Sequence, residues 1–328
     1  MKKNIALVTG GFSGEAVISY KSAVTIDNNL DRNLFNVYRI DINPEGWFYE
    51  KDGKRTAIDK NDFSLQADGN KITFDAVFIG MHGTPGEDGK LQGYFDTLKI
   101  PYTGCDAGTS AITFNKRYAV AVAGMAGINV ARSVLLIKNN FTSPDEITAT
   151  LQFPVFVKPN NGGSSIGMSK VNKPSDELGV AIEKAFKEDD QVLVEEVIKG
   201  REFTAGVFKT KGNIIVLPLT EVKAHADKAF FDFEAKYQGK SDEKTPADVD
   251  EVIADRIRDA ARKVYEVFNC KGVVRIDFIY NEETGKPFML EVNTIPGQSE
   301  ASIVPQQVKV MGWSLREFYT KLVEECFL

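Results

Sequence analysis

Two stretches rich in β-branched and aromatic residues, 273–280 and 288–297, flank a polar turn that contains glycine. This arrangement predicts a β-hairpin. We expect the turn to be centred on Thr284, so that residues equally distant from it face each other across the two strands. Because side chains alternate between the faces of a sheet, one face is then polar and the other apolar. The polar face carries two facing pairs: Asp277 with Glu291, and Arg275 with Asn293. The apolar face, the natural core side, carries Val274, Ile276, Phe278, Leu290 and Val292.

The facing carboxylates of Asp277 and Glu291 call for a cation between them, because like charges on directly opposed strand residues are destabilising. Two carboxylates and the amide oxygen of Asn293 make a set of hard oxygen ligands suited to Mg²⁺. Arg275 beside them supplies a fixed positive group for a phosphate or a developing oxyanion. The alternative is a surface hairpin in which Arg275 pairs with Asp277, and for a hairpin considered alone this alternative is favoured.

The overall composition is that of an ordinary globular protein large enough for two or three domains, with 328 residues of which 43% are hydrophobic and 26% charged. A net charge of −6 argues against a nucleic acid or an anionic membrane surface as the main partner. No signal peptide and no membrane-length apolar run are visible, so we expect a cytoplasmic protein. The three cysteines, Cys105, Cys270 and Cys326, are scattered and are predicted to be reduced thiols.

The chain begins with a short buried strand at 5–9, a glycine-rich turn at 10–14 and a helix that runs to about residue 29. Further strands are predicted at 36–42 and 75–80, which gives an α/β start of the Rossmann-like kind. A glycine-rich turn before a helix N-terminus is a potential ligand site. Glu15 lies in the first helical turn, where its negative charge interacts favourably with the helix dipole, and this is the simpler interpretation. Its carboxylate could also hold a substrate ammonium.

Three later residues could meet ligands, although each has a simpler interpretation. His82 follows the third strand in a glycine-rich loop, where a lone histidine is more often structural. Lys116 lies on a helix predicted over 111–126, and such a lysine is usually just solvated. Lys158 precedes a Gly/Ser-rich loop at 159–167 whose N–H groups and hydroxyls could hold phosphate oxygens, although a flexible hairpin tip is equally expected.

The second half of the chain contains a predicted strand at 192–198 that could line an adenine slot, with Glu202 close enough to reach a ribose hydroxyl. The irregular segment 229–246 is rich in aromatic and charged residues and is predicted to be a functional lid. A long helix over 248–268 leads into the hairpin. A capping box at Ser314 is expected to start the last helix.

Together these motifs resemble the D-alanine–D-alanine ligases of the ATP-grasp superfamily over nearly the whole chain. The matching motifs, in chain order, are GGFSGE at 10–15, HG at 82–83 with GEDG at 86–89, QG at 92–93, IPYTG at 100–104, FPVFVKP at 153–159, GSS at 163–165, GREFT at 200–204, FDFEAKY at 231–237, RIDF at 275–278 and EVNTIPG at 291–297.

The resemblance implies an α/β N-terminal domain over 1–104, followed by two α+β domains over 105–194 and 195–328. ATP is then clamped between two antiparallel sheets. It further implies a homodimer that joins two D-alanine molecules for peptidoglycan synthesis through an acyl phosphate, with two Mg²⁺ ions that Mn²⁺ can replace. This chemistry requires cationic groups that neutralise charge during phosphoryl transfer. It also requires hydrogen-bond donors for a tetrahedral oxyanion.

The resemblance also implies roles for individual residues. The expected ATP contacts are Lys116, Lys158, Ser165 and Lys236 near the phosphates, Glu195, Glu196 and Ile198 around adenine, and Glu202 on the ribose. The expected metal ligands are Asp277, Glu291 and Asn293. Arg275 and the Gly297 amide would form the oxyanion site. The expected substrate contacts are Glu15 with Ser164 and Tyr237 for the first D-alanine, His82 in the substrate pocket, and Ser302 and Ile303 for the carboxylate of the second.

Several positions depart from the family pattern and leave the acceptor open. They are Ala16-Val17, Asn115, Gln298-Ser299 and Ala301. Tyr237 resembles the dipeptide-forming type, whereas ligases that use D-lactate tend to have Phe or a rebuilt lid there. Two other functions are compatible with part of the sequence. The glycine-rich start at 8–14 allows a nicotinamide oxidoreductase, and the departures at the acceptor end allow a nucleotide-binding module without turnover.

Overall fold

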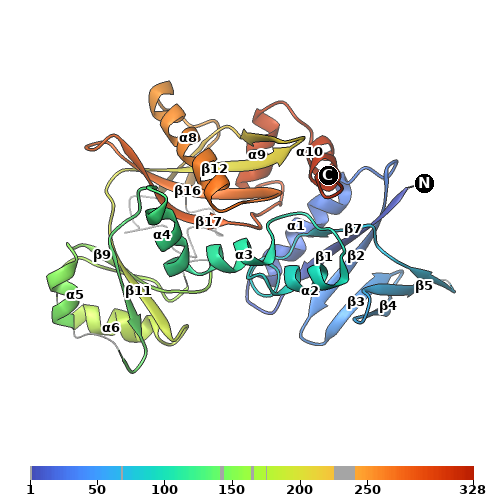
Figure 1. Cartoon of the computed structure of the whole chain (residues 1–328), viewed down its shortest axis with the longest axis horizontal. Coiled ribbons are helices and arrows are strands. Elements are labelled where there is room, and N and C mark those ends of the chain that lie inside the picture. Colours follow the sequence, from blue (N-terminus) through green and yellow to red (C-terminus); the bar gives the residue numbers. More distant parts are fainter. Residues whose placement is uncertain (1, 68, 141–143, 164–165, 175, 225–240) are drawn as a thin grey trace.

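The computed structural model is built on three β-sheets (Figure 1). It describes residues 2–67, 69–140, 144–163, 166–174, 176–224 and 241–328. None of the helices in these ranges is long and apolar enough to span a membrane.

The first sheet has a parallel centre, in which β1 (Lys3–Gly10) lies between β2 (Phe35–Asn43) and β7 (Ala76–Ile79). These strands confirm the predicted α/β start. An antiparallel extension of this sheet was not predicted, because its strands are short and mostly exposed or half-buried and so carry a weak apolar signal. The extension consists of β3 (Gly46–Lys51), β4 (Lys54–Asp59), β5 (Ser64–Ala67) and β6 (Asn70–Ile72).

Both faces of the first sheet are covered because four consecutive residues of its central strand, Ile5–Val8, are apolar and point to alternate faces. Ile5 and Leu7 pack under α1 (Ala16–Asn29) and the C-terminal helix α10 (Leu315–Glu325). Ala6 and Val8 pack on the other face, in a cluster that includes residues of α2 (Lys90–Leu98). The last helix of the chain thus completes the core around the first strand, and Figure 1 shows α10 beside α1.

The second sheet is antiparallel, and the helices of the described ranges that pack on it cover one of its faces. Val155, Val157, Val192 and Val194 pack in one cluster with residues of α5 (Pro144–Thr150) and α6 (Asp176–Ala185). The side chains that alternate with these valines along the strands, such as Lys158 next to Val157, therefore lie on the opposite face. The strands are β8 (Ser133–Ile137), β9 (Val155–Pro159), β10 (Ser169–Val171) and β11 (Gln191–Glu196).

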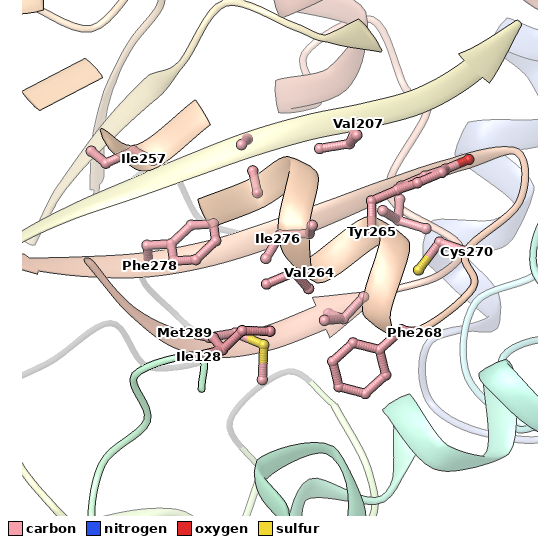
Figure 2. Close-up of a cluster of buried hydrophobic side chains, with 14 of the residues drawn as sticks. Ile128, Val207, Ile257, Val264, Tyr265, Phe268, Cys270, Ile276, Phe278 and Met289 are labelled. Carbon is pink, nitrogen blue, oxygen red and sulfur yellow. The ribbon is translucent and has the colours of Figure 1, made fainter. Parts of the chain in front are cut away.

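The third sheet contains the hairpin, and α8 (Glu251–Val267) packs on its apolar face. Figure 2 shows Ile257 and Val264 of α8 against Ile276, Phe278 and Met289 of the hairpin. Asp250 caps the start of α8 by accepting a hydrogen bond from the Val252 N–H. The strands are β12 (Arg201–Thr210), β13 (Asn213–Val216), β14 (Thr220–Ala224), β15 (Ser241–Lys244), β16 (Val273–Asn281) and β17 (Lys286–Asn293). After β17 the chain forms α9 (Ile303–Val310) and then α10.

The hairpin pairs Asp277 with Glu291 and Arg275 with Asn293, as expected, but the turn is not centred on Thr284. Asn281 pairs with Lys286, which centres the turn half a residue earlier. A register shift after Asp277 then restores the expected pairs. Because of this bulge, Met289 and not Leu290 faces the core: Met289 is 2% exposed and Leu290 is half-buried. The prediction of Leu290 as a core residue was therefore wrong.

The single helix predicted over 111–126 was also wrong, since the structure has two helices there. They are α3 (Ala107–Phe114) and α4 (Lys116–Met125), and Asn115 between them has an extended backbone. The Asn115 side chain accepts a hydrogen bond from the Tyr118 N–H and so caps α4. This break makes Lys116 the first residue of α4 and gives it a place at a helix N-terminus.

Candidate active site

A cavity of about 340 Å³ lies where the three sheets meet. Its wall is formed by the start of α1, the loop after β7, the junction of α3 and α4, the polar face of the hairpin and the segment 294–304. The hairpin motif and the glycine-rich start, separated by more than half of the chain, thus meet at one site.

Arg275 and Asp277 are joined on the polar face of the hairpin by two hydrogen bonds, 2.9 Å from Nε to Oδ1 and 2.7 Å from Nη2 to Oδ2. The guanidinium also lies 3.6 Å from the Glu291 carboxylate. The Thr204 hydroxyl donates to Asp277 from β12. The Arg275–Asp277 pair of the surface-hairpin alternative is therefore present, but this face of the hairpin lines the cavity instead of bulk solvent.

The donor set on this face fits a hard divalent cation. The Asn293 amide lies 3.4 Å from oxygens of both Asp277 and Glu291, so two carboxylates and one amide converge. Oxygen donors of this kind suit Mg²⁺. Within the described ranges no group of three or more His, Cys, Asp or Glu side chains is arranged to hold a metal, so the third protein ligand would be the amide of Asn293.

Glu15 lies at the N-cap position of α1, and its carboxylate occupies the space next to two glycines. A Cβ at Gly83 or at Gly163 would come within 2.6 Å of a Glu15 oxygen. Gly83 also has a φ of +66°, a left-handed conformation that favours glycine. The absence of side chains at these two positions therefore makes room for Glu15 at the cavity wall.

Glu87 is a second carboxylate in this corner, and the sequence analysis gave it no role although it belongs to the GEDG motif. It lines the cavity and accepts a hydrogen bond of 3.0 Å from the Gly83 N–H. Burial, together with the nearby charge of Glu15, raises the pKa of Glu87 to about 8. The raised pKa favours the neutral carboxyl of Glu87, which avoids two adjacent negative charges.

His82 is 6% exposed and has a hydrogen-bond partner at each ring nitrogen. Nδ1 lies 2.8 Å from the Ile295 carbonyl oxygen, and Nε2 lies 2.9 Å from the Ser22 hydroxyl. Its backbone N–H donates to the Ser19 hydroxyl. Burial lowers the pKa of His82 to about 4, so the ring is neutral at physiological pH.

The start of α9 forms another part of the cavity wall, and Ser302 is the N-cap residue of this helix. The Ser302 hydroxyl lies 2.7 Å from the Ser299 hydroxyl. A Cβ at Gly297 would come within 2.9 Å of the Ser302 hydroxyl. Ile303 and Gly297 both line the cavity. Ser302 and Ile303, expected at the second substrate, thus lie together with Gly297, expected at the oxyanion site.

Of the residues expected around ATP, some line the cavity and others lie outside its wall. Lys116 and Glu202 line the cavity, and Lys116 Nζ donates to the Gly162 carbonyl at 2.6 Å. Lys158 forms an ion pair with Glu195, 3.0 Å from Nζ to Oε1, on the face of the second sheet opposite α5 and α6. Both side chains are nearly buried, and neither borders the 340 Å³ cavity.

The remaining predicted ATP contacts are placed as follows. Glu196 accepts a hydrogen bond of 2.8 Å from the Gln152 N–H, and Ile198 is half-buried just after β11. Neither borders the cavity. Ser164, Ser165, Lys236 and Tyr237 lie outside the described residues, as does most of the predicted lid.

Comparison with known proteins adds an independent line of observation. Residues 4–105 match the family described as D-ala D-ala ligase N-terminus, and residues 122–324 match D-ala D-ala ligase C-terminus. The chain is 44% identical over 323 residues to the D-alanine–D-alanine ligase of Flavobacterium johnsoniae, with 98% of both chains covered.

Solved structures agree in fold over the whole chain. The TM-score is 0.89 with the VanG D-Ala:D-Ser ligase from Enterococcus faecalis, at 33% identity, covering 99% of this chain and 100% of that one. It is 0.80 with the D-alanine–D-alanine ligase from Bacillus anthracis complexed with ATP, at 28% identity, covering 100% and 97%. The fold and the cavity between its sheets define a ligase of the ATP-grasp class. The chain belongs to the D-alanine–D-alanine ligase family.

Proposed function

We propose that this protein joins two D-alanine molecules to D-alanyl-D-alanine and converts ATP to ADP and phosphate, as a step of peptidoglycan precursor synthesis. The single observation that carries the proposal is the facing pair Asp277 and Glu291, with Arg275 beside it, at a cavity that also reaches Glu15 and Ser302. One cavity thus holds groups for a phosphoryl donor, an ammonium and a carboxylate.

The reaction begins with the carboxylate of the first D-alanine attacking the γ-phosphate of ATP, which yields an acyl phosphate and ADP. Glu15 would bind the ammonium of this substrate, and Lys116 would neutralise phosphate charge from the N-terminus of α4. Two Mg²⁺ ions, or Mn²⁺ in their place, would lower the charge of the transferred group when held by Asp277, Glu291 and Asn293.

In the second step the amine of the other D-alanine attacks the acyl carbon, and phosphate leaves. Arg275 and the Gly297 N–H would donate to the oxyanion of the tetrahedral intermediate. Ser302 and Ile303 at the start of α9 would hold the carboxylate of the acceptor, and His82 forms part of the substrate pocket wall. Ser164 and Tyr237 would join Glu15, and Lys236 would reach the γ-phosphate.

The adenine end of ATP is proposed to lie against the face of the second sheet opposite α5 and α6. Lys158 and Glu195 are held there as an ion pair and are close to the backbone of Glu196 and Ile198. Glu202 would bind the ribose, and Ser165 the phosphates. A lysine kept in place by a buried carboxylate is preorganised for a phosphate, because little conformational freedom remains to be lost.

The identity of the second substrate has a specific alternative: the protein could be a ligase that uses an acceptor other than D-alanine. The VanG structure is named a D-Ala:D-Ser ligase, and this chain has Gln298, Ser299 and Ala301 at the acceptor end. Purified protein with MgATP and equal D-alanine, D-serine and D-lactate should form mainly D-alanyl-D-alanine, measured by mass spectrometry. A predominant mixed product would assign the rival function, and no product from folded protein would reject both.

We also propose a cytoplasmic homodimer with domains at 1–104, 105–194 and 195–328. The three separate sheets support this division into three domains. The proposed boundary between residues 194 and 195 falls within β11, which ends at Glu196. Val17, Tyr20 and Val24 form an exposed apolar strip along α1 that a second copy could cover. Light scattering after chromatography should give the mass of two chains, and Val24→Asp should give the mass of one.

A further inference from the structure

Four groups from three distant parts of the chain form a buried ring beside the cavity, which consists of three hydrogen bonds and is closed by the backbone of residues 295–298. The Ser22 hydroxyl on α1 lies 2.9 Å from His82 Nε2 and accepts the Gln298 N–H at 3.1 Å. His82 Nδ1 lies 2.8 Å from the Ile295 carbonyl. Ser22 is fully buried, and each of the other three residues is at most 6% exposed.

The direction of every bond in this ring follows from the chemistry of its members. A carbonyl oxygen only accepts, so the proton of the neutral imidazole lies on Nδ1. Nε2 is then an acceptor, and the Ser22 hydroxyl must donate to it. The Ser22 oxygen keeps its lone pairs for the Gln298 N–H. Both ring nitrogens of His82 are thus occupied by protein groups, and neither is left for a substrate.

The ring holds both ends of a short backbone segment that carries a proposed oxyanion donor. Pro296 and Gly297 lie between its two anchors, Ile295 and Gln298. The Gln298 side chain strengthens the hold, since its Nε2 donates to the Pro296 carbonyl at 3.2 Å. Its Oε1 accepts the Tyr319 hydroxyl at 3.2 Å from α10. The segment therefore has little freedom to turn the Gly297 amide away from the cavity.

We propose that Ser22 is a positioning residue of the ligation reaction, which aims the Gly297 N–H through its bonds to His82 and Gln298. The inference rests on the proposed role of Gly297 in the second step. In this proposal the neutral His82 ring connects α1 to the turn after β17 through its hydrogen bonds to Ser22 and Ile295. Ser22, Gln298 and Tyr319 thereby acquire roles in a reaction that none of them touches.

The bond pattern is tested without any activity measurement by ¹⁵N NMR of histidine-labelled protein. The chain has only two histidines, and His225→Asn assigns their signals. We expect His82 as the neutral tautomer with its proton on Nδ1, and we expect Ser22→Ala to shift the Nε2 resonance. A proton on Nε2 would overturn the inference, because Nδ1 could then not donate to Ile295.

The positioning role is tested by Ser22→Ala, for which Ser110→Ala is the matched control. Ser110 is equally buried on a helix, and its hydroxyl bonds to a backbone carbonyl away from the cavity. We expect kcat for dipeptide formation to fall roughly 10- to 100-fold in Ser22→Ala, as for a misplaced reacting group. The KM for ATP should not change, and Ser110→Ala should keep the wild-type kcat.

A split between the two chemical steps distinguishes positioning from general damage. Positional isotope exchange in ¹⁸O-labelled ATP reports acyl phosphate formation and should persist in Ser22→Ala while dipeptide formation falls. Equal loss of both steps, or an unchanged kcat, would overturn the positioning role. Tyr319→Phe is a milder variant that removes one hydroxyl, and we expect the same split with roughly a 2- to 10-fold loss. A wild type that forms no dipeptide would instead refute the proposed function, and the NMR result would stand apart from it.

Discussion

Arg275 binds Asp277 through two hydrogen bonds of 2.9 and 2.7 Å, on the face of the hairpin where Glu291 lies opposite Asp277. The arginine supplies positive charge to a pair of carboxylates that would otherwise repel each other. The same group lies at the cavity wall, where an oxyanion would form. One residue thus holds the carboxylate pair together and borders the cavity in which we propose the reaction.

Glu291→Gln should abolish turnover while the fold survives, because it removes one negative charge from the metal set and keeps the side-chain shape. We expect phosphate release to fall by on the order of 10²- to 10³-fold, which corresponds to several kcal/mol of transition-state stabilisation. Glu283→Gln in the exposed turn of the same hairpin is the control and should keep full activity. Normal turnover in Glu291→Gln, with an unchanged melting curve, would mean that the hairpin is not the metal site.

Lys158→Met should lower both stability and ATP affinity, because it leaves the Glu195 carboxylate buried without its partner. Removing one member of a buried ion pair costs about 3 kcal/mol or more in unfolding free energy. The double variant Lys158→Met with Glu195→Leu should recover most of the stability in urea titrations but not the ATP affinity. Recovery of ATP binding in the double variant would show that Lys158 has only a structural role.

An exposed ion pair provides the control for this comparison. Lys138 pairs with Asp190 at 3.0 Å, but both side chains are largely in solvent. Lys138→Met should therefore leave stability and ATP affinity close to those of the wild type.

Gly83→Ala should weaken use of the first D-alanine, because the added methyl would come within 2.6 Å of Glu15. Gly53→Ala is the matched control: its φ of +73° is similar to the +66° of Gly83, and nothing lies within 4 Å of the added atom. Both variants should lose about 1 kcal/mol of stability from backbone strain. Only Gly83→Ala should lose kcat/KM for D-alanine in steady-state assays. Equal kinetics in the two variants would contradict the placement of Glu15.

Glu87→Gln should change how stability depends on pH. The folded protein holds the pKa of Glu87 at about 8, whereas the carboxyl titrates at its ordinary value of 4.5 when unfolded. Between these values the folded state binds one more proton, so stability falls as pH rises through this range. The wild type should therefore lose up to about 1.4 kcal/mol per pH unit relative to Glu87→Gln.

Urea unfolding of both proteins between pH 5 and pH 9 measures this difference. The exposed Glu282→Gln serves as the control and should follow the wild type throughout. Parallel curves for Glu87→Gln and the wild type would contradict the raised pKa.

The sequence by itself determined the hairpin and the strand, glycine-rich turn and helix at the start of the chain. Each of these depends on local periodicity, which is present in neighbouring residues. The break at Asn115 also has a local signal, since asparagine is a favoured N-cap residue.

Only the tertiary structure decided the bulge that buries Met289 in place of Leu290, the ion pair of Lys158 with Glu195 and the ring through Ser22 and His82. The bulge arises where two strands adjust to a shared core, and the ring joins groups that lie far apart along the chain. Such contacts depend on how separate elements pack together. No spacing pattern within a single segment carries that information.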